Sequence, residues 1–297
     1  MNNYLFSGIT VPLLTPFNKD GSINKPEYEK LIEYVISGGV SGLFVGGTSG
    51  EFVNLSLGER IKQLKIAKNT SKGRARILFN ITALDIEDLM QLIDAAKEYS
   101  ADAVSITPPF YYKYDDKALA NYFCKVASLC YPIPVYLYNI PGMAKNIISP
   151  NVFKEVCMSS DNIRGIKDSS MDFMTFLEFQ IYSPSDNIEI LTGNDAQVLT
   201  ALQAGGFGAV IAMANVYPKL CVSIVENYRL GNIEKARACQ EKVLLLRSLV
   251  REVMPIMSHK YMLTLLNFEM GPARFPFRDL TPEEQKKIAD GVARINP

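Results

Sequence analysis

The chain has 297 residues, of which 48% are hydrophobic and 21% charged, so one domain could bury a large core. Its 31 basic and 31 acidic residues give a formal net charge of zero, which leaves no long-range field to attract nucleic acid or an anionic membrane. The composition therefore favours a small-molecule substrate, and we expect neither a nucleic acid nor a membrane as partner.

The N-terminal residues 1–5 lack a basic region followed by an apolar one, and no later apolar run is long enough to span a bilayer. We therefore expect a cytoplasmic protein. The cysteines are odd in number and include no Cys-x-x-Cys pair, which predicts free thiols. They are Cys124, Cys130, Cys157, Cys221 and Cys239.

Eight short apolar or β-branched runs alternate with longer amphipathic stretches. The runs are residues 8–14, 42–45, 76–80, 103–106, 134–139, 163–167, 188–192 and 208–212. Their starts lie 20 to 34 residues apart, which suits one strand, one crossover helix and two short loops per unit. Eight such units predict an α/β fold of the closed (β/α)8 (TIM) barrel type, with a doubly wound open sheet as the alternative.

Helix starts are marked along the chain. Ser56 and Glu59 have the spacing of a capping box, and Asp85 and Asp195 are expected to cap the helices after the third and seventh runs. Helical segments also follow the eighth run, at residues 217–230, 232–254, 260–267 and 281–295. We therefore expect a catalytic barrel over residues 1–230 and a C-terminal helical appendage, residues 231–297, packed on it.

Polar residues follow the carboxyl ends of the predicted strands, where barrel enzymes collect their catalytic groups. These residues are Thr15, Gly46, Gly47, Thr48, Ser49, Gly50, Glu51, Asn80, Thr107, Tyr138, Asn139, Lys167, Asp168, Gly193, Asn194 and Asp195. The single histidine, His259, cannot supply both a base and metal ligands, and the chain has no complete nucleotide-binding fingerprint. We therefore expect no metal and no cofactor. Asp195 stands where a phosphate would bind, which favours an unphosphorylated substrate.

Lys167 ends the apolar run 163–167 and would point into a partly dry cavity. Burial favours the neutral form of an amine, and a neutral amine can attack a ketone. From position alone, an ordinary lysine paired with Asp168 or another carboxylate is the commoner case. Tyr138, at the end of the neighbouring run, could relay a proton or could simply pack. Thr48 and Ser49 lie in a Gly-rich turn whose amides and hydroxyls could hold a carboxylate.

Taken together, these segments resemble the dihydrodipicolinate synthase and N-acetylneuraminate lyase family of class I aldolases. The resemblance covers nearly the whole chain. It is carried by residues 8–17 (GITVPLLTPF), 47–52 (GTSGEF), 138–141 (YNIP), 165–170 (GIKDSS) and 193–195 (GND).

The resemblance implies that Lys167 is the Schiff-base lysine and Tyr138 the proton-transfer tyrosine. It also implies that Thr48 and Ser49 contact the pyruvate carboxylate, with Thr48 serving in addition as a relay between tyrosines. Tyr111 resembles the tyrosine that completes this relay from a neighbouring subunit, and Tyr112 is the alternative in the adjacent position. A homotetramer built as a dimer of dimers is the expected assembly. Gly47, Gly193, Asn194, Asp195, Met143 and Val210 complete the expected substrate-binding set.

Departures from the family pattern bear on the substrate. In dihydrodipicolinate synthases the loop after the tyrosine carries an arginine that holds a substrate carboxylate, whereas this chain has Met143 there. In sialic acid lyases an acidic residue follows the aspartate that corresponds to Asp195, whereas this chain has Ala196. The Glu51-Phe52 pair and residues 271–274 (GPAR) look more like the branch that cleaves 2-keto-3-deoxy sugar acids or 4-hydroxy-2-oxo acids.

The preferred interpretation is retro-aldol cleavage of such an acid to pyruvate and an aldehyde through an imine at Lys167. The alternatives are condensation of pyruvate with aspartate semialdehyde, as in 4-hydroxy-tetrahydrodipicolinate synthase, and cleavage of N-acetylneuraminate. A noncatalytic sensor of 2-oxo acids is the alternative from a different class. It is disfavoured because pure binding needs no lysine nucleophile with a proton relay.

Overall fold

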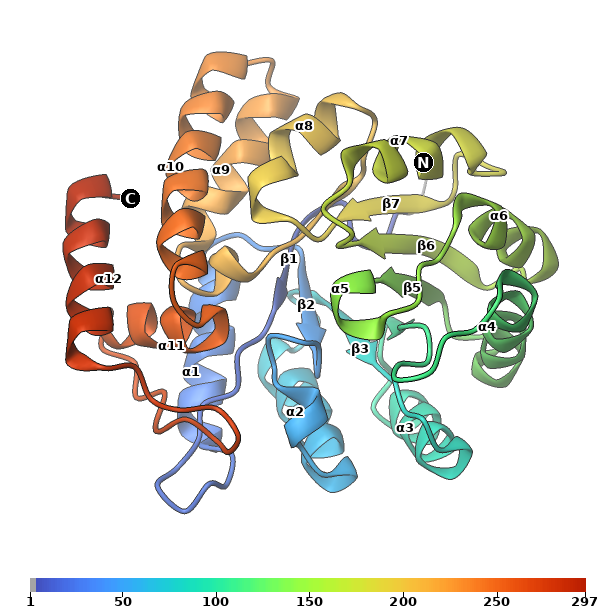
Figure 1. Ribbon diagram of the computed structural model, residues 1–297, viewed down its shortest axis with the longest axis horizontal. Coiled ribbons are helices and arrows are strands. Elements are labelled where there is room, and N and C mark those ends of the chain that lie inside the picture. Colours follow the sequence, from blue (N-terminus) through green and yellow to red (C-terminus); the bar gives the residue numbers. More distant parts are fainter. Residues whose placement is uncertain (1–3) are drawn as a thin grey trace.

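The structure is a computed structural model, and it describes residues 4–297 (Figure 1). The first three residues of the segment 1–5 therefore lie outside the described residues. Eight parallel strands form a closed barrel in chain order, and β8 pairs with β1 through Gly208 and Gly8. This closure confirms the (β/α)8 prediction and excludes the open sheet. The strands are β1 (Gly8–Pro12), β2 (Gly42–Val45), β3 (Arg76–Asn80), β4 (Ala103–Ile106), β5 (Val135–Asn139), β6 (Ile163–Asp168), β7 (Glu189–Thr192) and β8 (Gly208–Val210).

Helices surround the strands on the outside of the barrel (Figure 1). They are α1 (Lys25–Ser37), α2 (Leu57–Ser71), α3 (Ile86–Glu98), α4 (Asp116–Cys130), α5 (Pro141–Ala144), α6 (Pro150–Ser159), α7 (Phe173–Tyr182), α8 (Val198–Gln203) and α9 (Pro218–Arg229). Short 3₁₀ turns follow β2, β7 and β8, namely η1 (Phe52–Asn54), η2 (Asp195–Gln197) and η3 (Ala212–Asn215).

The predicted helix caps are confirmed at two places and wrong at the third. Ser56 and Glu59 form a reciprocal capping box at α2, and the Asp85 carboxylate accepts two backbone N–H groups at the start of α3. After β7 the capping side chain is Asn194, which accepts from the Ala196 amide at 3.1 Å. Asp195 instead accepts the Met213 amide at 2.9 Å, because η3 approaches it from the end of β8.

Alternate strand residues face two separate cores, as the twofold repeat of a strand requires. Leu43 and Val45 pack outward with the helices, whereas Phe44 between them joins the cluster inside the barrel. The interior cluster consists of Phe6, Phe44, Leu78, Ala103, Tyr136, Tyr138, Leu191 and Val210. At the amino-terminal end of the barrel the Glu189 carboxylate accepts the Phe6 amide at 2.9 Å. Phe6 is itself fully buried in the interior cluster, so this end of the barrel interior is filled, and barrel enzymes carry their sites at the opposite end.

The C-terminal part of the chain forms α10 (Ile233–Arg251), α11 (Pro255–Thr264) and α12 (Pro282–Ile295), which lie together on one side of the barrel (Figure 1). α10 packs on α9, and α12 packs on α10 and α11. A Cβ atom added at Gly291 would lie 2.5 Å from the Leu249 side chain, so glycine allows this close approach of α12 to α10. α11 begins five residues earlier than predicted, with Pro255 at its first position, where a missing N–H costs nothing.

Candidate active site

Lys167 and Tyr138 stand side by side at the carboxyl ends of β6 and β5, where they are register partners. Only 3% of Lys167 is exposed. Its Nζ atom lies 3.9 Å from the centre of the Tyr138 ring and 4.8 Å from that of Phe44, on β2. The barrel therefore holds the lysine amine in an aromatic pocket, next to a phenol.

Asp168 does not neutralise this lysine, which corrects the sequence-based alternative of a Lys167–Asp168 pair. One Asp168 carboxylate oxygen accepts from the Asn139 side-chain amide at 2.8 Å and the other from the Ser170 hydroxyl at 2.9 Å. Burial raises the pKa of the Asp168 carboxyl, while the bonds from Asn139 and Ser170 act in the opposite direction. Within residues 4–297, Lys167 makes no ion pair.

Gly193 provides the space through which the lysine side chain passes. A Cβ atom at this position would lie 2.9 Å from Cε of Lys167 and would overlap Oγ of Ser169. The Gly193 amide also donates to the Asp168 carbonyl at 2.6 Å, which fixes the start of the loop after β7. Gly193 therefore serves the site by having no side chain.

Thr48 connects the Gly-rich loop after β2 with this pair, since its hydroxyl lies 3.3 Å from the Tyr138 hydroxyl. Gly46 has a φ of +66°, which favours glycine, and a Cβ atom at Gly47 would lie 2.7 Å from the Phe44 ring. The Gly50 amide donates to the Gly47 carbonyl at 3.0 Å. The tight turn thus directs Thr48 toward Tyr138.

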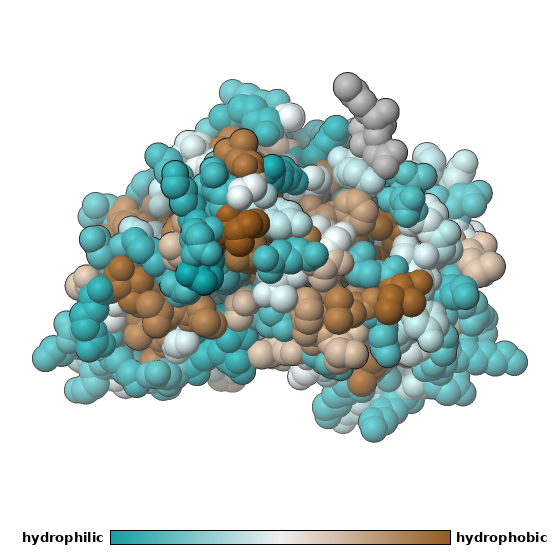
Figure 2. All heavy atoms as spheres, turned by 90° about the horizontal axis from the view of Figure 1, so that it is seen from above, coloured by the Kyte–Doolittle hydropathy of each residue, from teal (hydrophilic) through white to brown (hydrophobic). Residues whose placement is uncertain are grey.

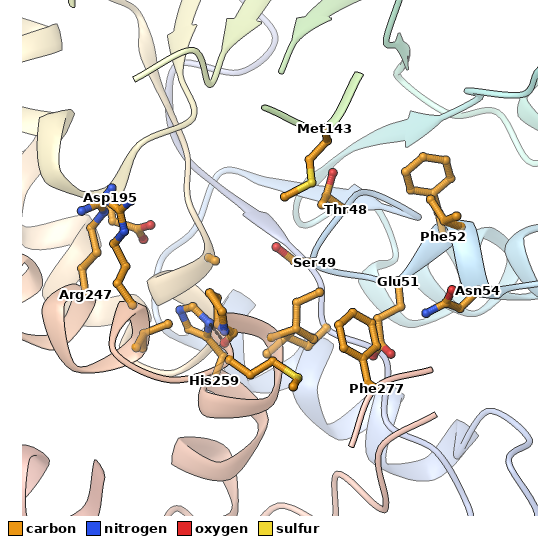
Figure 3. Close-up of a pocket in the computed structure, with 18 of the residues that line it drawn as sticks. Thr48, Ser49, Glu51, Phe52, Asn54, Met143, Asp195, Arg247, His259 and Phe277 are labelled. Carbon is orange, nitrogen blue, oxygen red and sulfur yellow. Dashed lines mark hydrogen bonds between the residues drawn. The ribbon is translucent and has the colours of Figure 1, made fainter. Parts of the chain in front are cut away.

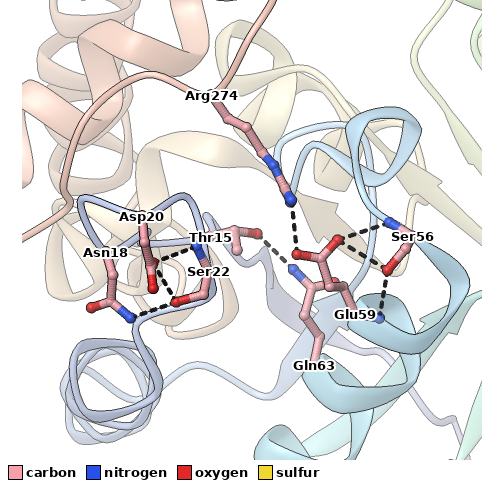
Figure 4. A network of polar contacts seen from close by, with 8 residues as sticks. All are labelled: Thr15, Asn18, Asp20, Ser22, Ser56, Glu59, Gln63 and Arg274. Atoms are coloured by element: carbon pink, nitrogen blue, oxygen red, sulfur yellow. Dashed lines mark hydrogen bonds and ion pairs between the residues drawn. The ribbon is translucent and has the colours of Figure 1, made fainter.

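Buried polar contacts hold this loop from outside. The Thr15 hydroxyl donates to the Gly50 carbonyl at 2.7 Å. It also accepts from the Gln63 amide at 2.6 Å, a contact shown in Figure 4. In the same region Arg274 reaches Glu59, the capping residue of α2, at 2.9 Å. β1, α2 and the C-terminal segment therefore all support the loop that carries Thr48 and Ser49.

A buried ion pair adds a further support that the sequence analysis missed. Glu51 has a φ of +63° and is 3% exposed, and its carboxylate lies 2.5 Å from Nζ of Lys260 on α11. Burial lowers the pKa of Lys260, while the attraction of Glu51 opposes this shift. Nothing in the helical pattern around Lys260 marks it for burial, because its partner is more than 200 residues away in the chain.

A cavity of about 580 Å³ lies above these residues (Figure 3). Four of the residues predicted to bind substrate are part of its wall, namely Thr48, Ser49, Met143 and Asp195. The Met143 side chain is 69% exposed and lies next to Thr48 in Figure 3. Lys167 and Tyr138 are not among the residues that line the cavity. Thr48 connects the cavity with this pair, because it lines the cavity and its hydroxyl contacts that of Tyr138.

Several other residues were expected at the site but do not line this cavity. Val210 belongs to the interior cluster that also contains Tyr138, and the Asn194 side chain is occupied as the cap of η2. Tyr111 is 73% exposed in the loop after β4, where its ring meets that of Tyr112 edge-on at 5.1 Å. In the part of the chain that the structure describes, no hydrogen bond joins Tyr111 or Tyr112 to Thr48 or Tyr138.

His259 lines the cavity from α11, with Nδ1 2.7 Å from the Pro255 carbonyl oxygen. Burial lowers its pKa, and the attraction of Asp195 partly opposes this. Across residues 4–297, histidine, cysteine and carboxylate side chains nowhere gather in threes that could hold a metal ion. None of the helices formed by these residues combines the length and the apolar character needed to cross a membrane.

A closed (β/α)8 barrel with a buried lysine at the end of its sixth strand, next to a tyrosine, defines the class of Schiff-base-forming barrel enzymes. The comparison with known families agrees. Residues 5–295 match the dihydrodipicolinate synthetase family, so this chain belongs to that family of class I aldolases and lyases.

Similar proteins carry two kinds of name. The chain is 30% identical to the 4-hydroxy-tetrahydrodipicolinate synthase of an Exiguobacterium strain, over 98% of this chain and 99% of that one. It is 29% identical to the probable 2-dehydro-3-deoxy-D-pentonate aldolase YjhH of Escherichia coli, over 85% and 84% of the two chains. Among solved structures, YagE of E. coli in complex with pyruvate, a prophage protein of the same family, has a TM-score of 0.95 with 26% identity and 99% coverage of both chains.

Proposed function

We propose that this enzyme is a pyruvate-dependent aldolase that cleaves an unphosphorylated 2-keto-3-deoxy sugar acid or 4-hydroxy-2-oxo acid. The observation that carries the proposal is the buried Lys167 amine, without a carboxylate partner in the described chain, 3.9 Å from the Tyr138 ring. The Tyr138 hydroxyl is in turn 3.3 Å from that of Thr48. The proposed nucleophile and the proposed proton relay are thus in contact range, which supports the proposal.

In the proposed reaction the Lys167 amine adds to the 2-keto carbon, and loss of water gives a protonated imine. Tyr138 accepts the proton of the C4 hydroxyl and passes its own to Thr48, which gives up its hydroxyl proton to the relay beyond it, and the relay later returns a proton to C3. The C3–C4 bond breaks, its electron pair moves to the imine to form an enamine, and the aldehyde leaves. Protonation at C3 and hydrolysis then release pyruvate and restore the amine.

The choice of substrate branch rests on Met143. This thioether borders the cavity beside Thr48 and Ser49, at the place where a synthase of the family carries an arginine. A thioether cannot form the bidentate ion pair that an aldehyde carboxylate requires at that position, but it can border a hydroxylated chain. Condensation with aspartate semialdehyde is the second candidate function, favoured by the synthase names among the relatives. Cleavage of N-acetylneuraminate is disfavoured by Ala196.

The proposed assembly is a homotetramer in which Tyr111 of a neighbouring subunit completes the relay beyond Thr48. Support comes from the exposure of Tyr111 together with other large apolar side chains, such as Met174 and Ile181 on α7. Figure 2 shows that hydrophobic residues form several groups among hydrophilic ones on one face of the molecule. Exposed apolar groups of this kind are typical of subunit contacts.

A substrate panel tests the proposal. Pyruvate release is measured from 2-keto-3-deoxygluconate, 4-hydroxy-2-oxoglutarate and N-acetylneuraminate, in parallel with condensation of pyruvate and aspartate semialdehyde. The proposal expects the highest kcat/KM for one of the first two compounds. Efficient condensation with weak cleavage would favour the synthase. Imine formation without turnover of any substrate would favour the noncatalytic sensor.

A further inference from the structure

Two arginines stand on the wall of the cavity, one helical turn apart. Arg247 and Arg251 of α10 line the same cavity as Thr48 and Ser49. Residues four positions apart share one face of a helix, so the two guanidinium groups are neighbours. Like charges at this spacing repel each other, and Arg251 accordingly acts against the positive charge of Arg247.

Neither arginine has an ion-pair partner within residues 4–297, although other arginines of this chain do. Arg237, on the same helix, lies 2.6 Å from Glu234. The hydrogen-bond contact of Arg247 is with the sulfur of Met171, at 4.0 Å, and a thioether is a weak acceptor. Arg251 lies in the last turn of α10, where the carboxyl end of the helix attracts a cation, and Arg247, a turn further in, is attracted by the Asp195 carboxylate without forming an ion pair with it.

The charged groups around the cavity do not fully neutralise these two arginines. Burial lowers the pKa of His259, which favours its neutral form, and the Glu51 carboxylate is paired with Lys260. Asp195 offsets one of the positive charges and uses one oxygen to accept the Met213 amide. The lining of the cavity therefore keeps a net positive charge at the end formed by Asp195 and the arginines.

The two arginines lie where the end of the substrate opposite the keto acid would reach. In Figure 3, Asp195 and Arg247 lie on one side of the cavity, away from Phe52, with Thr48, Ser49 and Met143 between them. In the proposed function, the keto carbon is at Lys167 and the first carboxylate at Thr48 and Ser49. The remaining chain of the substrate then extends along the cavity toward α10.

We propose that Arg247 and Arg251 form a subsite for a second carboxylate, at the end of the substrate opposite the keto acid. The preferred substrate is then a dicarboxylic 2-keto-3-deoxy sugar acid, or a shorter 4-hydroxy-2-oxo diacid. This inference rests on the proposed function and narrows its substrate class. The fork of guanidinium N–H donors matches the two oxygens of a carboxylate, and Asp195 remains available to accept from a substrate hydroxyl.

The test compares three substrates of equal carbon number that differ at C6: 2-keto-3-deoxyglucarate, 2-keto-3-deoxygluconate and 2-keto-3-deoxy-6-phosphogluconate. The expected kcat/KM of the wild type is at least about tenfold higher for the dicarboxylate than for the other two. In Arg247→Met and Arg251→Met, this preference falls by about tenfold or more, mainly through a higher KM for the dicarboxylate. Arg237→Met, on the same helix but outside the cavity lining, leaves the preference unchanged.

Three results would overturn the subsite: no preference for the dicarboxylate, an equal loss for all three substrates in the arginine variants, or a preference for the phosphorylated compound. A separate measurement isolates the proposed function. Borohydride trapping of pyruvate on the wild type needs no distal carboxylate and reports only on imine formation. Trapping at Lys167 without a dicarboxylate preference rejects the subsite alone, whereas absence of trapping rejects the Schiff-base aldolase itself.

Discussion

Nζ of Lys167 lies 3.9 Å from the centre of the Tyr138 ring, and the two residues are register partners on neighbouring strands. Their relation is fixed by the hydrogen-bonded ladder between β5 and β6, so neither side chain depends on a mobile loop for its position. A rigid arrangement of this kind favours reaction because little motion is needed to align the reacting groups.

The first prediction concerns a covalent adduct between pyruvate and Lys167. Sodium borohydride added together with pyruvate should reduce an imine and attach the three-carbon unit irreversibly to Lys167. Peptide mapping by mass spectrometry identifies the lysine. Lys167→Met, which keeps a similar apolar stem without the amine, should show no label. Label on Lys260, the other buried lysine of the site region, would instead assign the nucleophile to α11.

The second prediction concerns the Tyr138 hydroxyl. Tyr138→Phe keeps the ring against Lys167 but removes the relay to Thr48, so kcat should fall by about 100-fold or more, as for other lost acid–base groups. Tyr136→Phe is the matched control, because Tyr136 lies two residues earlier in the same interior cluster. Thermal unfolding verifies that both variants fold. Equal rates in the two variants would show that Tyr138 only packs.

The third prediction follows from the absence of a side chain at Gly193. In Gly193→Ala the new methyl group overlaps the Ser169 side chain and crowds Cε of Lys167, so the amine must move. A displacement near 1 Å can lower the rate about 100-fold. Gly58→Ala is the control, since a Cβ atom there meets no atom within 4 Å. The rate of borohydride trapping measures the effect, and normal trapping in a folded Gly193→Ala variant would contradict it.

The fourth prediction is a pH dependence of stability from His259, the single histidine of the sequence. Burial lowers its pKa in the folded state below the ordinary value of ~6.5. Between these two values the unfolded chain binds more protons, so the free energy of unfolding decreases as the pH falls, by at most about 1.4 kcal/mol per pH unit. Urea unfolding from about pH 7.5 to 5.5 measures this slope. His259→Gln should flatten it, and identical slopes in both proteins would refute the assignment.

The fifth prediction concerns the identity of the aldehyde. Met143→Arg places a cation on the wall of the cavity, where the chain of the proposed substrate offers hydroxyl groups, and should lower kcat/KM for 2-keto-3-deoxy sugar acids. Met158→Arg is the control, because Met158 is equally exposed, at 69%, but lies on α6 outside the cavity lining. Pyruvate trapping is measured in parallel to exclude damage to Lys167. A wild type that condenses aspartate semialdehyde far better than it cleaves any sugar acid would show that Met143 was misinterpreted.

Much of this architecture could be predicted from local patterns in the sequence. Eight apolar runs at strand length, with helices of regular spacing between them, predict a parallel α/β fold and favour a closed barrel, while the open sheet was excluded only by the pairing of β8 with β1. Once the strands are placed, Lys167 and Tyr138 fall at neighbouring carboxyl ends. The capping box at Ser56 and Glu59 was also predictable, because both partners lie within one helical turn.

Contacts between distant segments were decided only by the tertiary structure. The sequence left Lys167 either free or paired with Asp168, and the choice depended on Asn139 and Ser170 occupying the Asp168 oxygens. Glu51 and Lys260 meet more than 200 residues apart in the sequence, and Asp195 bonds to η3 instead of capping a helix. A residue's neighbours along the chain determine its secondary structure, but the partners of a buried charge are set by the packing of whole elements.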